Sequence, residues 1–159
     1  MLSPLRVLVL THMRPGATPR RWHRLPPLLA GLGWEVLHLP RERWREFIPA
    51  LVRFRPRAVV AAGPIAFLPA LLRRRGLLRS FLVHDWLDDY AENVGSIYGR
   101  RLVSGLEGIA VAGADLVTSP SAFRAERARR EGKRAVFIPH GVEENFDAVS
   151  PRDLPGRSR

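Results

Sequence analysis

Short runs of aliphatic residues recur along the chain and alternate with segments of helical periodicity. Six of these runs predict buried β-strands, because they are continuous, rich in Val, Leu, Ile and Ala, and bounded by polar residues or glycine. The predicted strands cover residues 6–10, 34–39, 58–62, 80–84, 115–118 and 135–138.

The segments between the strands predict helices at 26–32, 48–54, 65–75, 99–113 and after Ser119-Pro120-Ser121. The first helix is expected to be short, because Pro26 and Pro27 are tolerated only in a first turn. Residues 99–113 place an apolar stripe on one side of an amphipathic helix. That stripe consists of Leu102, Leu106, Ile109 and Gly113.

Strand and helix alternate at the spacing of βαβ units, which assemble into a parallel sheet with helices on both faces. We therefore predict an α/β fold: a three-layer Rossmann-like domain, residues 1–147, with a parallel sheet of about six strands. The Pro-, Arg- and Ser-rich stretch 148–159 is predicted to be a linker or tail. Ligands of such sheets bind beyond the carboxyl ends of the strands, so the loops after the strands are the candidate sites.

The composition narrows the possible chemistry. The 159 residues include no cysteine, which excludes disulfides, thiolate metal sites and cysteine nucleophiles. The net charge of +11 favours phosphates, nucleic acid or an anionic membrane, while the alternative is a solvated surface without a partner. No helix-turn-helix, RNP or zinc signature accompanies the charge, so nucleic acid is not a predicted partner.

Neither a secretory signal nor an apolar stretch of about 20 residues is visible, which predicts a cytoplasmic protein that is soluble or peripheral to a membrane. Clusters of arginine would suit an anionic leaflet or a lipid-linked acceptor, and the alternative is again a solvated helix face. These clusters are Arg73 to Arg75 with Arg79, and Arg124, Arg127, Arg129 and Arg130.

The loop after the fourth predicted strand has the highest density of reactive groups, because residues 84–90 read His-Asp-Trp-Leu-Asp-Asp-Tyr. A crowded carboxylate such as Asp85 or Asp88 can accept a proton from a substrate hydroxyl, while His84 can hydrogen-bond such a hydroxyl. Trp86 or Tyr90 offers a face on which a sugar ring can pack. The alternative is a helix start at which Asp88 or Asp89 caps backbone N–H groups.

The first loop contains His12 and Gly16 in a basic turn before a helix, which can receive a phosphate through backbone N–H groups. It carries neither a GxGxxG fingerprint nor a Walker lysine, so an ordinary surface loop is the alternative. We predict no metal site: the carboxylates at 85, 88 and 89 supply hard oxygen ligands, but their spacing is not Asp-x-Asp.

Two segments near the end of the chain resemble the end of the N-terminal domain in family 4-like GT-B glycosyltransferases. Residues 112–121 read Ala-Gly-Ala-Asp-Leu-Val-Thr-Ser-Pro-Ser, and residues 136–142 read Val-Phe-Ile-Pro-His-Gly-Val. Upstream, Gly33-Trp-Glu-Val36 resembles the family's Gly-His-Glu-Val segment, and Phe54-Arg-Pro-Arg-Ala-Val-Val60 resembles its Arg-Pro-Asp-Val-Val strand. Leu82-Val-His-Asp85 resembles the family's strand that ends in His or Asp. The likeness spans residues 5–147.

The resemblance implies a nucleotide-sugar donor as co-substrate and no other cofactor. It implies that Gly16 lies against the donor diphosphate, that His84 touches the donor sugar, and that Asp85 or Asp88 acts as base if the enzyme inverts. The remaining predicted substrate-binding residues are His12, Trp86, Asp89, Ser119 and, lining an interdomain cleft, His140 and Gly141.

The chain also departs from the family pattern. Arg57 and His140 replace an expected Asp and Asn, and Gly16 lacks a neighbouring glycine. The family's second domain holds the nucleotide through two glutamates eight residues apart, a spacing absent from this sequence. We expect a C-terminal Rossmann-like domain to join in cis or in trans, with no activity without it. The alternative is a non-catalytic module that docks on a partner chain.

Overall fold

The computed structural model describes residues 5–11, 20–88, 90–92 and 94–139 and shows one parallel six-stranded sheet. The strand order is β2-β1-β3-β4-β5-β6, and every neighbouring pair is parallel. The strands are β1 Arg6–Thr11, β2 Glu35–Leu39, β3 Ala58–Ala62, β4 Phe81–Asp85, β5 Leu116–Ser119 and β6 Ala135–Phe137. The predicted Rossmann-like α/β fold is confirmed.

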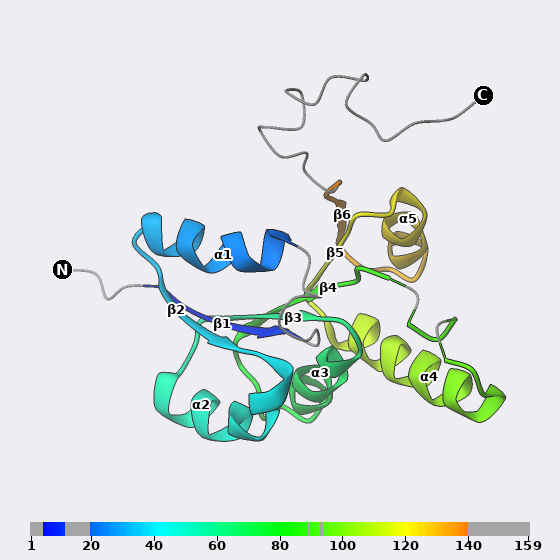
Figure 1. Cartoon of the computed structure of the whole chain (residues 1–159), viewed down its shortest axis with the longest axis horizontal. Coiled ribbons are helices and arrows are strands. Elements are labelled where there is room, and N and C mark those ends of the chain that lie inside the picture. The colour runs from blue at the N-terminus through cyan, green and yellow to red at the C-terminus, as the bar shows by residue number, and fades with distance from the viewer. Residues whose placement is uncertain (1–4, 12–19, 89, 93, 140–159) are drawn as a thin grey trace, which may run out of the picture.

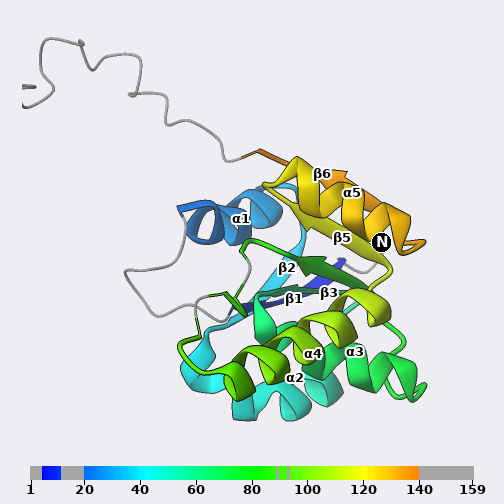
Figure 2. The same ribbon diagram turned by 90° about the vertical axis from the view of Figure 1, so that its right-hand side faces the viewer.

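Helices cover both faces of this sheet, with α1 on one side and α2, α3 and α4 on the other (Figure 1). Turned by 90°, the domain shows α3 and α4 lying side by side, in direct contact (Figure 2). The helices are α1 Arg20–Gly31, α2 Phe47–Phe54, α3 Phe67–Arg74, α4 Ile97–Gly113 and α5 Ala122–Arg130, with 3₁₀ turns η1 Arg41–Glu46 and η2 Pro64–Ala66.

The strand order places a topological switch point between β1 and β3, because the chain leaves β1 toward β2 and then crosses back to β3. Open α/β sheets bind ligands at such a point, outside the carboxyl ends of the strands. All six strands are parallel, so the segments that follow β3, β4 and β5 meet at this same edge.

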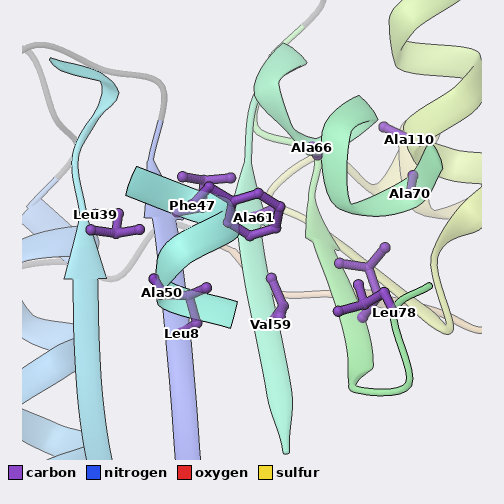
Figure 3. Packing of buried hydrophobic residues seen from close by; sticks show 12 residues of the cluster. Leu8, Leu39, Phe47, Ala50, Val59, Ala61, Ala66, Ala70, Leu78 and Ala110 are labelled. Carbon is purple, nitrogen blue, oxygen red and sulfur yellow. The ribbon is translucent and has the colours of Figure 1, made fainter. Parts of the chain in front are cut away.

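The larger core cluster lies between the sheet and α2, α3 and α4 (Figure 3). Phe47, fully buried at the start of α2, packs with strand residues such as Leu8 and Val59. Ala66, Ala70 and Ala110 keep the side chains small where η2, α3 and α4 approach. These apolar contacts fix the helices beneath the edge at which ligands would bind.

Helix α1 is longer than predicted, because it spans twelve residues and contains Pro26 and Pro27 in its interior. Each proline deletes one backbone donor, which normally breaks a helix. Here Leu25 and Leu29 pack on the sheet cluster of Val7 and neighbouring residues, and proline's fixed φ is itself compatible with a helix. The burial of this apolar face offsets the lost hydrogen bonds.

The prediction for α4 was correct for the helix and wrong for one member of its apolar stripe. Leu106 and Ile109 are partly buried and Gly113 is buried, whereas Leu102 is 64% exposed. The buried positions of α4 therefore lie in its second half, and the N-terminal end of the predicted stripe faces solvent. No helix among the described residues combines the length and the apolar character needed to cross a bilayer.

Asp115, the residue just before β5, ties three elements together. Arg73 of α3 donates to its Oδ1 at 2.5 Å, and the backbone N–H of Leu82 in β4 donates to its Oδ2 at 2.8 Å. A carboxylate with this pair of partners holds α3 and β4 against the start of β5, so its role in the domain is structural.

Candidate functional site at the carboxyl ends of β4 and β5

Asp85 is the last residue of β4, not part of the following loop as predicted. Its side chain is 1% exposed, and Thr118 of β5 donates a hydrogen bond to its Oδ1 at 2.6 Å. The two residues are register partners in the parallel ladder, so sheet pairing itself brings hydroxyl and carboxylate together. The result is a carboxyl group held in a fixed position at the strand edge where ligands bind.

His84 is fully buried, and its Nδ1 lies 3.3 Å from the carbonyl oxygen of Ala61 on β3. In the tautomer that carries its proton on Nδ1, the ring donates to that carbonyl. Burial lowers the pKa of His84 to about 4, because the charged form loses its hydration, and the Ala61 hydrogen bond opposes this shift only in part. The imidazole is therefore neutral at physiological pH. Contact between His84 and the donor sugar stays a prediction.

Acidification is expected to destabilise the domain through His84. The unfolded pKa is near the ordinary 6.5 and the folded pKa is about 4, so the unfolded chain binds the proton first and stability falls as pH drops through this window. Between about pH 6.5 and about pH 4.5 this linkage amounts to about 2 kcal/mol.

Urea titrations of the wild-type chain and of His84→Leu across this range measure the effect. The difference between the two proteins should change by about 2 kcal/mol, because the other titrating groups are common to both. Parallel pH profiles would contradict the assignment of a depressed pKa to this ring.

Trp86 and Ser119 hold the strand ends together. The Trp86 ring is 3% exposed, packs with Val111 and Val117, and lies 5.3 Å from the guanidinium of Arg127. Ser119, in β5 and not at a helix start, donates to the carbonyl of Trp86 at 2.7 Å. Both lie at the predicted edge, but their described contacts are with protein groups, and substrate binding by them stays a prediction.

Asp88 is the exposed carboxylate of the site, with 59% of its side chain accessible. Arg124 of α5 lies 3.4 Å from its Oδ1 and also donates to the carbonyl of Leu87 at 3.3 Å. Helix α4 begins at Ile97, and its N-cap is Ser96. The alternative that Asp88 caps this helix is therefore wrong, and its carboxylate faces solvent three residues after the end of β4.

Tyr90 joins this loop to α4, because its backbone N–H donates to Oε1 of Glu107 at 3.1 Å. Burial raises the pKa of the Tyr90 phenol above its usual range, and the charges of Asp88, Asp85 and Glu107 raise it further. The phenol thus stays protonated beside three carboxylates. Glu107, 5% exposed, and Arg124 were missed from sequence, since both read as ordinary polar helix positions.

A cavity of about 460 Å³ adjoins the loop. Its walls come from η1, η2, the start of α3, the 90–94 segment and α4, and its lining is almost wholly apolar. The lining residues are Trp44, Pro64, Ile65, Phe67, Leu68, Tyr90, Val94, Val103 and Leu106. The size is typical of small-ligand sites, and Tyr90 connects it to the carboxylates.

Five predicted site residues lie outside the described residues, namely His12, Gly16, Asp89, His140 and Gly141. Their predicted roles stay predictions. Among the described residues, no group of three or more histidine, aspartate or glutamate side chains is arranged to hold a metal ion.

Comparison with known proteins gives one family. The model described as Glycosyltransferase Family 4 matches residues 4–146, which is nearly the whole chain. A search of the curated proteins gives no match.

Proposed function

The chain belongs to glycosyltransferase family 4, and from this premise we propose that it recognises the acceptor and supplies part of the active site for transfer from a nucleotide sugar. The observation that carries the proposal is the pairing of two features at one strand edge. The carboxyl groups of Asp85 and Asp88 follow one another at the end of β4, and Tyr90, two residues after Asp88, lines a ligand-sized apolar cavity.

The two candidate carboxylates differ in accessibility, and this separates their roles. Asp88 is exposed and can reach an acceptor hydroxyl, whereas Asp85 is buried and held by Thr118. If the transfer inverts the anomeric configuration, we therefore assign proton acceptance to Asp88. Asp85 is the positioning group, because its hydrogen bond with Thr118 fixes the end of β4 from which the loop starts.

In an inverting reaction the acceptor oxygen forms a bond to the anomeric carbon while the bond from that carbon to the donor phosphate breaks. The hydroxyl proton passes to the Asp88 carboxylate, and the nucleoside diphosphate leaves with the electron pair. Arg124, paired with Asp88, keeps the carboxylate oriented before the acceptor arrives. We place the nucleotide on a second Rossmann-like domain, joined in cis or in trans.

The test uses the assembly that cells make of this chain, purified through a tag on it. That assembly is incubated with radiolabelled UDP-glucose, UDP-N-acetylglucosamine and GDP-mannose, together with an extract of the same cells as the source of acceptors. Transfer of label to an acceptor supports the proposal. An assembly that releases or transfers no sugar from any donor contradicts it and favours a non-catalytic docking module.

A further inference from the structure

The cavity beside Tyr90 has a lining suited to hydrocarbon. Val103 and Leu106 of α4 line it together with Val94, and Ile65 of η2 and Leu68 of α3 complete the aliphatic lining. Such a surface offers few hydrogen bonds to a sugar, since every buried hydroxyl without a partner costs free energy. It suits an aliphatic chain, whose burial is favourable in proportion to its area.

The helix that forms one wall also carries apolar groups in open solvent. Ile97, Tyr98 and Leu102, all on the first two turns of α4, are 66%, 85% and 64% exposed. Arg100 and Arg101, both exposed, lie among them. Large apolar side chains interleaved with cations are typical of a helix that rests at a lipid interface.

Cationic groups flank the cavity on two sides. The Arg45 guanidinium lies 6.0 Å from the ring of Trp44, which lines the cavity on the η1 side. On the α4 side, Nε of Arg100 donates to the carbonyl of the lining residue Val94 at 2.9 Å, and Arg100 and Arg101 share an adjacent surface hollow with Glu92. Among the described residues, no carboxylate forms an ion pair with any of these three arginines, so their remaining N–H groups can receive an anionic group.

We propose that the cavity binds the hydrocarbon chain of an anionic lipid, and that this lipid is the sugar acceptor. The assignment of this lipid as the sugar acceptor rests on the proposed function, whereas the binding of the lipid rests on the geometry of the cavity alone. The chain enters between η1 and α4, and the charged head stays at the arginines. Tyr90, which belongs to both the cavity and the carboxylate loop, lies between the chain and Asp88.

Calorimetric titration of the 159-residue chain with dodecyl phosphate, below its micelle concentration, tests the binding. Shortening the probe to decyl and octyl phosphate should weaken binding by roughly two- to fourfold per methylene, and inorganic phosphate alone should bind at least a hundredfold more weakly. Affinity that does not depend on chain length would overturn the proposal.

Two variants on α4 give the matched comparison. Val103→Glu places a charge in the cavity and should weaken dodecyl phosphate binding at least about tenfold. Gly108→Glu adds the same charge at an exposed position outside the cavity and away from the arginines, where nothing lies within 4 Å of a new Cβ, and should leave binding within about twofold. If circular dichroism shows that Val103→Glu does not fold, Trp44→Ala replaces it, because Trp44 lines the cavity from a partly exposed position of η1. This variant should also weaken dodecyl phosphate binding. A folded cavity variant that binds dodecyl phosphate as tightly as the wild-type chain would contradict the proposal.

The role of the arginines has its own comparison. Arg100→Gln combined with Arg101→Gln should weaken dodecyl phosphate about tenfold and leave dodecyl maltoside unchanged, because only the phosphate is anionic. Equal loss for both probes would overturn the charge assignment. These measurements need no turnover: normal lipid binding by an assembly that transfers no sugar refutes the proposed function alone, and transfer without lipid binding refutes only this inference.

Discussion

Gly113→Val is expected to destabilise the domain by about 3 kcal/mol or more, an overpacking effect at the upper end of its usual range. A Cβ atom at this position would lie 2.6 Å from Cβ, 2.8 Å from Cα and 2.9 Å from the carbonyl oxygen of Ala70. Two of these three atoms are backbone, so the clash cannot be relieved by a side-chain rotation. The whole of α3 would have to move away from α4.

The consequence would extend to the candidate site. Helix α4 carries Glu107, which holds Tyr90, and α3 and η2 form one wall of the apolar cavity. Separating the two helices therefore widens the cavity as it weakens the core. Urea unfolding followed by circular dichroism measures the stability loss, and dodecyl phosphate titration of the folded fraction measures the effect on the cavity.

Gly108→Ala is the matched control, since it adds a Cβ to the same helix where nothing lies within 4 Å. Replacing an exposed helical glycine by alanine should stabilise the domain by about 0.5–1 kcal/mol. The two substitutions thus have opposite predicted signs. A loss of stability in both would indicate that α4 tolerates no change, and would contradict a contact specific to Gly113.

Asp88→Asn is expected to lower sugar transfer by about 10²- to 10⁴-fold if the transfer inverts the anomeric configuration, because that is the usual contribution of a positioned general base. The amide retains the shape of the carboxylate and can still accept a hydrogen bond from Arg124, so the loop should keep its position. What it loses is the capacity to take the acceptor's proton. Initial rates with a saturating nucleotide sugar measure the effect in the assembly that contains the chain.

Glu92→Gln is the control for this substitution, because it neutralises another exposed carboxylate four residues further along the same loop. It should leave the transfer rate within about twofold, since an exposed charge away from the reacting atoms contributes little. Asp85→Asn is measured in parallel as the positioning group. Unchanged transfer in both Asp85→Asn and Asp88→Asn would reject the assignment of a base to this loop.

The strands of the domain were predictable from the sequence, because each depends on a short local pattern of apolar residues. Continuous aliphatic runs predicted all six strands, with ends within one residue of those observed. The one-residue difference at the strand ends matters at two positions, because it places Asp85 and Ser119 in strands and not in loops. Their side chains are therefore fixed by the pairing of the strands. The length of α1 was missed, since proline statistics describe isolated helices and take no account of the sheet beneath Leu25.

The sequence alone placed reactive residues at the carboxyl edge of a parallel sheet, because strand direction and crossover handedness follow from alternation of strands and helices. Only the tertiary structure decided which of those residues meet. Thr118 reaches Asp85 and Arg124 reaches Asp88 across 33 and 36 positions of sequence. Pairing of that kind depends on sheet register and helix packing, which apolar periodicity does not encode residue by residue. Burial of His84 and the apolar cavity follow from the same packing.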